Sequence, residues 1–458
     1  KNAMQQLKIG LLPLYLQLYD EVKPEVRPTL EPFVDTIAEQ FTQRQVEVLK
    51  APVCRLQSEI AAALASFTAA GVTAVVTLHL AYSPSLEAAD VLAESELPLL
   101  LLETTPAYDF NFSPAGKTMA NHGIHGVQDL ANVLGRRKKE FLLYAGHWQH
   151  SDIFSRALEG LQAAALARNF RQSRVGLLGQ PFAGMGDFSL PIADMERLLG
   201  IKVQQFPENF SAPLVAGELA AEEASDRERF EFGIMEHETY RRTLRASLRV
   251  RKWLEQEKLS AFTLCFRDIT AAAGWETVPF LEASKSLARG IGYAGEGDVL
   301  TAALVAALAQ LHPETTFTEM FCPDWQNNML YLSHMGEMNL NLVQGRPYLR
   351  EAQYAFSATA APAVAYGVYK PGPASIVNLA PLADERFRLL VCKGVCFAPP
   401  DVASAAVMGW FKPARNLPEF LELYSRNFGT HHSALCYGIN SRLLATFAKL
   451  QGWDVVEI

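Results

Sequence analysis

Apolar segments alternate with amphipathic ones along the first third of the chain. Short apolar runs occupy residues 7–12, 46–52, 72–80 and 97–103, and segments with helical spacing of apolar residues lie between and after them. The run Val72–Leu80 reads VTAVVTLHL and is rich in β-branched residues, as expected for a buried strand. Strands that alternate with helices of ten or more residues predict βαβ units and a parallel sheet.

The same alternation resumes at Arg174 and then gives way to a different pattern. After about residue 316 the apolar segments become short, and Pro and Gly punctuate them, as in Pro371-Gly372-Pro373. Regular short strands with turn residues are typical of an antiparallel sheet or barrel. We therefore predict an α/β protein with two doubly wound parallel-sheet domains, at 1–170 and 171–315, followed by a mostly antiparallel, barrel-like domain at 316–458.

Composition narrows the class of protein. The 458 residues carry 41 Lys and Arg against 49 Asp and Glu, a net charge of −8, which argues against nucleic acid as the main partner. The sequence has no uncharged apolar run of about 18 residues, so we expect no membrane-spanning helix. No charged segment followed by an apolar core opens the chain, so we expect no secretory leader. The six cysteines form no Cys-x-x-Cys pair, and we expect buried thiols in a reducing cytosol.

Four polar residues of the second half stand out because each lies in or beside an apolar segment. They are Glu296, Glu319, His334 and His432. Two carboxylates and two imidazoles suit Mn²⁺, Fe²⁺, Co²⁺ or Zn²⁺ better than Ca²⁺ or Mg²⁺, which prefer oxygen ligands alone. The four lie far apart in the sequence and form no compact motif such as His-Glu-x-x-His. Their chemistry alone leaves a metal site open beside ordinary structural roles.

The glycines around Glu296 indicate a special backbone. The segment Gly295-Glu296-Gly297-Asp298 departs from the dinucleotide motif G-x-G-x-x-G, because Leu300 takes the position of the third glycine. We expect the glycines to let the backbone approach a ligand closely while Glu296 points at it. Asp298 is predicted as the N-cap of the helix that follows.

Histidines also cluster in the first domain. His122 and His125 lie in NHGIHGVQD, and His147 and His150 lie in AGHWQH, so four of the ten histidines fall within a short span. Capping and core hydrogen bonds are the ordinary roles for each of them taken singly. Together they favour a polar pocket.

At these residues the sequence resembles the L-arabinose isomerase family over essentially its whole length. GYAGEGDVLTAAL at 292–304 resembles the family's Gly-Glu-Gly-Asp segment, and TTFTEMF, LSHMGE and GTHHSAL resemble the segments that carry its other metal ligands. AGHWQ at 145–149 is a further match. The resemblance implies that Glu296, Glu319, His334 and His432 bind a divalent metal, usually Mn²⁺, with Co²⁺ as an alternative.

The resemblance also implies a reaction. The family interconverts an aldose and its ketose through an ene-diol. Glu296 and Glu319 would then both hold the metal and act as base and acid, in an order that the sequence leaves open. His334 and His432 would be ligands without a role in proton transfer. His431 would lie behind the ligands and orient its neighbour.

Sugar-binding positions carry over less evenly. The resemblance implies a role for His125, which in the family reaches the sugar from a neighbouring subunit, and therefore a homo-oligomer, a trimer or hexamer, with the site near a subunit interface. The metal should lie in the cleft between the second and third domains. The other positions that match family residues lining the sugar pocket are Tyr82, Phe266, Gln17 and either Met185 or Phe182.

Departures from the family pattern bear on the choice of sugar. The first strand reads LLPLYLQLYD where the family has Gly-Ser-Gln, and Gly179–Phe182 replaces Gly-Asp-Asn-Met. Tyr82 stands where the family usually has Phe, and its phenol favours a sugar with a further hydroxyl. We therefore keep as alternatives another pentose, a 6-deoxyhexose such as L-fucose, or a hexose. A non-catalytic sugar-binding protein is the alternative of another class, and it has no need of the Glu/His set.

Overall fold

The computed structural model of the chain describes residues 6–400 and 406–458 and divides them into two compact units. The N-terminal unit contains the residues up to 168 together with 449–452. The C-terminal unit contains 169–448 and 453–458.

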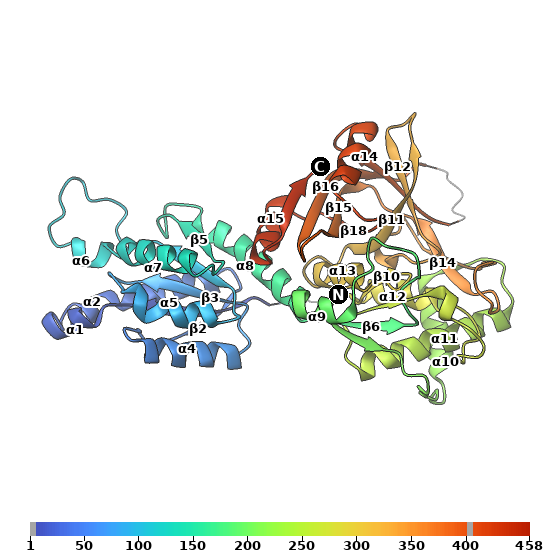
Figure 1. Cartoon of the computed structure of the whole chain (residues 1–458), viewed down its shortest axis with the longest axis horizontal. Coiled ribbons are helices and arrows are strands. Elements are labelled where there is room, and N and C mark those ends of the chain that lie inside the picture. Colours follow the sequence, from blue (N-terminus) through green and yellow to red (C-terminus); the bar gives the residue numbers. More distant parts are fainter. Residues whose placement is uncertain (1–5, 401–405) are drawn as a thin grey trace. The chain divides into compact units, whose positions relative to one another are not determined.

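The N-terminal unit is built on a five-stranded parallel sheet with the order β2-β1-β3-β4-β5. Figure 1 shows these strands among helices of the same unit. The strands are β1 (Lys8–Leu14), β2 (Glu47–Lys50), β3 (Ala74–His79), β4 (Leu99–Glu103) and β5 (Leu142–Ala145). The helices are α1 (Gln17–Val22), α2 (Arg27–Leu30), α3 (Pro32–Thr42), α4 (Gln57–Ala69), α5 (Ser85–Glu94), α6 (Thr118–Asn121), α7 (Ile124–Arg136) and α8 (Ile153–Arg171), the last of which ends beyond the boundary of the unit.

The core of this unit follows from the alternation of side chains along the strands. Leu12, Val75 and Leu101 point to one face of the sheet, where they join the apolar residues of α4, α5 and α7 in one cluster. Gly10 is required in β1, because a Cβ atom there would lie 2.4 Å from the ring of Phe67 in α4. The order of the strands reverses between β1 and β3, and crevices for ligands form beyond the carboxyl ends of strands at such a point.

The C-terminal unit contains a smaller parallel sheet with the order β10-β9-β6-β7. Its strands are β6 (Arg174–Leu178), β7 (Lys202–Gln205), β9 (Ala261–Leu264) and β10 (Gly292–Gly295). The helices that precede the barrel are α9 (Ile192–Leu199), α10 (Glu218–Arg229), α11 (His237–Gln256), α12 (Phe280–Ala288) and α13 (Val299–Leu311).

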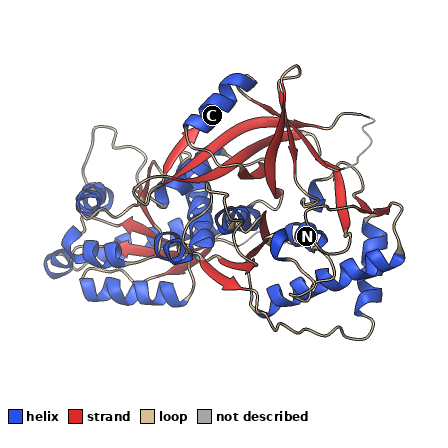
Figure 2. Ribbon diagram, turned by 45° about the vertical axis from the view of Figure 1, so that its right-hand side comes forward, coloured by secondary structure: helices blue, strands red, loops and turns tan. Residues whose placement is uncertain are grey.

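A closed antiparallel barrel completes this unit, and its long curved strands are prominent in Figure 2. Six strands follow one another in the order β16-β15-β18-β11-β12-β17, and a further pairing of β16 with β17 closes the ring. They are β11 (Thr315–Asp324), β12 (Met329–Ser333), β15 (Gly372–Pro381), β16 (Phe387–Phe397), β17 (Val407–Pro413) and β18 (His432–Tyr437). The remaining elements are β8 (Glu231–Phe232), β13 (Tyr348–Glu351), β14 (Ala363–Val368), β19 (Asp454–Glu457), α14 (Leu417–Arg426) and α15 (Ser441–Leu450).

The structure confirms the predicted fold class of two parallel α/β sheets followed by an antiparallel barrel. The division into three domains at 170 and 315 stays a prediction beside the two compact units. No helix of the described residues is long and apolar enough to cross a membrane. The expectation of buried thiols is wrong at one position, because Cys322 lies beside a bulge of β11 and is exposed, whereas the other five cysteines are buried.

A buried ionic network joins α10, α11 and α12. The carboxylate of Glu282 is fully buried and accepts hydrogen bonds from Arg251 at 3.0 Å and from the Ser247 hydroxyl at 2.6 Å. Lys285 reaches Glu222 and Asp226 at 2.7 Å each. Burial alone would raise the pKa of Glu282, but Arg289 and Arg251 outweigh it and hold that pKa below its usual value.

We expect Glu282→Gln to destabilise the fold, because it removes the fully buried carboxylate that Arg251 and Arg289 share. Breaking one partner of a buried ion pair costs about 3–5 kcal/mol of unfolding free energy. Denaturant unfolding measures the change, and Glu238→Gln is the matched control, since Glu238 is 63% exposed in its pair with Arg245. Equal stability of the two variants would contradict the prediction.

Acid should weaken the N-terminal unit through His79. Its ring lies between the hydroxyls of Thr77 at 3.1 Å and Ser83 at 2.8 Å, and burial lowers its pKa from 6.5 to about 3. Between these two pKa values, the His79 ring binds a proton in the unfolded chain but stays neutral in the folded one. Stability should therefore fall as the pH drops from 6.5 towards 3, by up to about 1.4 kcal/mol per pH unit.

This contribution should disappear in His79→Gln. Urea midpoints of wild type and variant at pH 7.5, 5.5 and 4.5 measure it, with His150→Gln as the control at an exposed histidine. A pH dependence that is the same in all three proteins would show that His79 is not responsible.

Candidate metal centre

Four strands of the C-terminal unit bring the predicted metal ligands together. Glu296 directly follows β10, and Glu319 lies within β11. His334 directly follows β12, and His432 is the first residue of β18. Glu319 is paired with His432 on one side and with Ser333, the neighbour of His334, on the other. Residues directly opposite in an antiparallel pair share a face, so this register places Glu319 beside His432.

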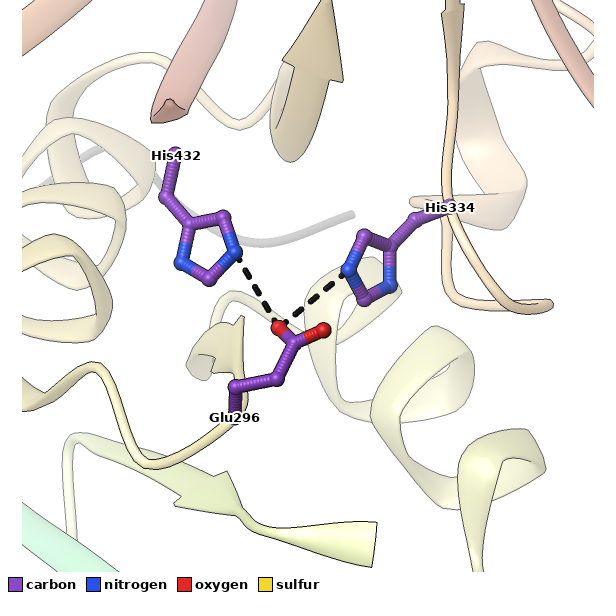
Figure 3. A group of neighbouring side chains, drawn as sticks. All are labelled: Glu296, His334 and His432. Carbon is purple, nitrogen blue, oxygen red and sulfur yellow. Dashed lines mark ion pairs between the residues drawn. The ribbon is translucent and has the colours of Figure 1, made fainter. Parts of the chain in front are cut away.

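The four side chains form a compact cluster. Oε2 of Glu296 lies 3.1 Å from Nε2 of His432 and 3.4 Å from Nε2 of His334 (Figure 3). Oε2 of Glu319 lies 3.5 Å from the same nitrogen of His334. Glu296, His334 and His432 are buried, and Glu319 keeps partial exposure, with 20% of its side chain accessible. The cluster therefore has one open side, at Glu319.

The donor atoms of this cluster fit a divalent cation. Oε2 of Glu296 and Nε2 of His432 are buried without a hydrogen-bond partner among the described residues, and an unsatisfied buried polar atom is costly. Two ligands held at about 2.1 Å from one ion lie about 3.0–3.4 Å apart, which matches the separations of Glu296 from His432 and His334. A Glu/His donor set is the chemistry that Mn²⁺, Co²⁺ and Zn²⁺ accept.

Carboxylates behind the histidines fix their orientation. Nδ1 of His432 lies 3.0 Å from Oδ2 of Asp298, and Nδ1 of His334 lies 2.5 Å from Oε2 of Glu337. Glu337 also accepts a hydrogen bond of 2.8 Å from the hydroxyl of Tyr293. Histidines that bind metal usually donate their second N–H to such a partner, which leaves Nε2 for the ion.

Charges within the cluster shift its pKa values. Burial alone would raise the pKa of Glu296, but His334 and His432 outweigh it and hold the pKa well below its usual value. Burial alone would lower the pKa of His432, but Asp298 and Glu296 raise it to about 9. Burial raises the pKa of Glu319. The two carboxylates of the cluster thus lie in different electrostatic environments.

The backbone at Glu296 is strained, and the glycines beside it are necessary. Glu296 has a φ of +56°, a left-handed backbone conformation that residues other than Gly rarely adopt. A Cβ atom at Gly295 would lie 2.8 Å from the ring of His334, and one at Gly297 would lie 2.5 Å from Cα of Pro181. The close approach that the glycines permit is therefore to the protein's own groups. Asp298 accepts from the backbone N–H of Thr301 at 2.9 Å, which confirms it as the N-cap of α13.

Aromatic rings enclose the cluster. Phe317 lies edge-on to His334 at 4.8 Å and to His432 at 5.1 Å, between ring centroids. Phe188 stacks on His432 at 5.2 Å. Such an apolar wall limits access of water and strengthens the electrostatic interactions within.

Two predicted sugar-binding positions lie next to this cluster. The ring of Phe266 lies 5.8 Å from that of Phe182, whose backbone N–H donates to the carbonyl of Glu296 at 2.9 Å. Met185 belongs to the same loop, and its backbone N–H donates to the carbonyl of Phe182 at 3.2 Å. Phe266 and Met185 thus both contact Phe182, the residue that is hydrogen-bonded to Glu296.

The other three predicted positions lie in the N-terminal unit. Gln17 is the first residue of α1, which follows β1, and Tyr82 follows β3, so both lie beyond the carboxyl ends of neighbouring strands. His125 is exposed on α7, with its ring 5.8 Å from that of His122. The phenol of Tyr82 is already engaged, because it donates to Asp129 at 3.0 Å. These residues and the Glu/His cluster belong to different units.

Sequence reasoning missed three groups beside the cluster. Glu337 lies three residues after His334 within LSHMGE, and that spacing was the available signal. Asp187, whose Oδ2 lies 2.7 Å from Nδ1 of His431, and Phe188 had no signal beyond a Gly-rich loop.

Comparisons with known proteins agree with this site. The family model of the L-arabinose isomerase central domain matches residues 223–313, and that of the L-arabinose isomerase C-terminal domain matches 314–454. Together they cover just over half of the chain and all four residues of the cluster.

Relatives of the same name extend the similarity. The chain is 25% identical over 356 residues to an L-arabinose isomerase of Herpetosiphon aurantiacus. This alignment covers 74% of the chain and 70% of the relative. It is 25% identical over 419 residues to L-arabinose isomerase 1 of Bacillus licheniformis, which covers 84% and 80%. An L-arabinose isomerase of Shewanella sp. (strain ANA-3) is 24% identical over 357 residues, with coverage of 73% and 69%.

Fold, site and comparisons define the class of protein as an aldose–ketose sugar isomerase. Within that class, the chain belongs to the L-arabinose isomerase family.

We expect Glu337→Gln to weaken Mn²⁺ binding, because the carboxylate that fixes His334 is lost. Substitution of such outer partners costs about 10–100-fold in metal affinity or activity. Titration calorimetry on chelator-stripped protein measures the affinity. Glu314→Gln is the control, since Glu314 is 51% exposed in its pair with Lys370. Unchanged affinity in Glu337→Gln would contradict this role.

Proposed function

We propose that this protein is a metal-dependent isomerase that converts L-arabinose to its ketose through an ene-diol. The observation that carries the proposal is the Glu/His cluster with two buried donor atoms, Oε2 of Glu296 and Nε2 of His432, that lack hydrogen-bond partners among the described residues. The names of the relatives and the fit of the donor set to Mn²⁺, with Co²⁺ as the alternative, support it.

The surroundings of each residue in the cluster indicate its role in the proposed reaction. Glu296, Glu319, His334 and His432 hold the cation. When bound, the cation supplies Lewis acidity that polarises the carbonyl of the open sugar and stabilises the charge that develops on oxygen. His334 and His432 take no part in proton transfer, because Glu337 and Asp298 engage their second nitrogens.

The two glutamates carry the protons. One carboxylate moves the proton between C1 and C2, and the other moves the hydroxyl proton between O1 and O2. Both lie within 3.5 Å of a histidine of the cluster, and the partial exposure of Glu319 gives the sugar access to the pair. Phe188 and Phe317 exclude water from the buried side.

The rest of the sugar pocket is part of the same proposal. Phe266 and Met185, which accompany Glu296, contact the sugar. Gln17, Tyr82 and His125 complete the pocket in a homo-oligomer, a trimer or hexamer, in which His125 comes from a neighbouring subunit. The exposure of His125 on α7 is consistent with this role.

The test is ketose formation from a panel of aldoses by chelator-stripped protein, with and without Mn²⁺. The panel contains L-arabinose, D-galactose, L-fucose, L-ribose, D-xylose and D-altrose. We expect Mn²⁺-dependent turnover of L-arabinose that Glu296→Gln abolishes and Glu314→Gln preserves.

Other outcomes separate the alternatives. Preference for another sugar of the panel would keep the reaction and correct the substrate. Sugar binding without turnover and without bound Mn²⁺ would replace the isomerase by a sugar-binding protein.

A further inference from the structure

Asp187 bridges a distant loop to the histidine pair of β18. Its Oδ2 accepts a hydrogen bond of 2.8 Å from the backbone N–H of His431 and lies 2.7 Å from Nδ1 of the same residue. The two residues are 244 positions apart in the sequence. His431 in turn belongs to a group with Glu319 and His432 in which one donor atom of each lies within 4.8 Å of the others.

The loop that carries Asp187 is fixed against the cluster at both of its ends. The backbone N–H of Phe182 donates to the carbonyl of Glu296 at 2.9 Å. Phe188 is 2% exposed and stacks on His432, with 14° between the ring planes. Asp187 and Phe188 lie within a turn in which the N–H of Ser189 donates to the carbonyl of Gly186. The Asp187 carboxylate is therefore held in place beside His431.

We propose that Asp187 is a positioning residue of the isomerase site and acts through His431. The inference rests on the proposed function and adds a residue to it. An ionised carboxylate can only accept hydrogen bonds, so Nδ1 of His431 carries a hydrogen and donates it to Asp187. Asp187 thereby holds the His431 ring with a hydrogen on Nδ1 and orients its other nitrogen, beside Glu319, towards a hydroxyl of the sugar.

The contact between Asp187 and His431 is not needed to fix the backbone at the start of β18. Asn378 already fixes the start of β18, because its amide donates to the carbonyl of His432 at 2.7 Å and its oxygen accepts from the N–H of Thr430 at 3.0 Å. The second oxygen of Asp187, Oδ1, is buried without a hydrogen-bond partner among the described residues, which is unfavourable. The benefit that offsets this cost is the contact with His431.

Kinetics of Asp187→Ala and Asp187→Asn with Mn²⁺ and the aldose that the wild type isomerises test the proposal. We expect Asp187→Ala to lower kcat by about 10–100-fold while Mn²⁺ affinity, measured by calorimetry, stays that of the wild type. Asp187→Asn should restore kcat, because its amide oxygen can accept both hydrogen bonds. Asp194→Ala is the matched control, since Asp194 forms an exposed pair with Arg197 and should leave kcat unchanged.

A second measurement needs no turnover. Nitrogen-15 spectra of the histidines in metal-free protein report the tautomer of His431, whose signals are assigned by their absence in His431→Gln. We expect the form protonated at Nδ1 in the wild type and in Asp187→Asn, and its loss in Asp187→Ala.

Three results would overturn the inference: an unchanged kcat in Asp187→Ala, a loss of Mn²⁺ affinity that parallels the loss of kcat, or a tautomer that does not respond. Absence of turnover by the wild type on every aldose would instead overturn the proposed function, which distinguishes the two failures.

Discussion

The pairing of β11 with its two neighbours is the constraint on which the site depends. Glu319 lies opposite His432 of β18 and opposite Ser333 of β12, so one strand sets the positions of three of the four cluster residues. Because side chains alternate across a strand, a slip of one residue would turn Glu319 to the other face of the barrel. Closure of the barrel by β16 and β17 leaves the six strands little freedom to slip.

The same constraint concentrates negative charge. Glu296 and Glu319 lie inside the cluster, Asp298 and Glu337 lie directly behind its two histidines, and Asp187 lies behind the adjacent His431. Five carboxylates thus surround three imidazoles, and three of the five, Glu296, Asp298 and Glu337, are buried. Burial of so many acids is unfavourable unless positive charge compensates for them. The divalent cation of the proposed function would supply that charge, and its binding would also offset the cost of the strained backbone at Glu296.

Features that depend on contacts between residues close in the sequence could be predicted from it, whereas contacts between distant segments could not. Periodicity predicted both parallel sheets and the barrel, because these depend on local pattern. The predicted ligands come from four separate segments, so their spacing carries no signal. They stood out as polar residues beside apolar segments, and only the resemblance to a family assigned them to one metal site.

The residues that hydrogen-bond to the site residues from behind cannot be found from local sequence patterns. Asp187 and His431 meet only through tertiary structure, and a Gly-rich loop gives no indication of its partner. The same holds for the hydrogen bond that the phenol of Tyr82 donates to Asp129 in α7, which no local pattern indicates. Asp298 was accessible as an N-cap because that role is local, whereas its contact with His432 is not.

Asp298 also limits how this chain can change. One oxygen of its carboxylate caps α13, a helix buried along nearly its whole length, and the other holds His432. A substitution there would disturb folding and the orientation of His432 together, so neither property can be adjusted separately at this position. The segments that follow β1 and β3 belong to the other unit and take no part in these two contacts. Substitutions in those segments can alter the protein without disturbing the cap of α13 or the position of His432.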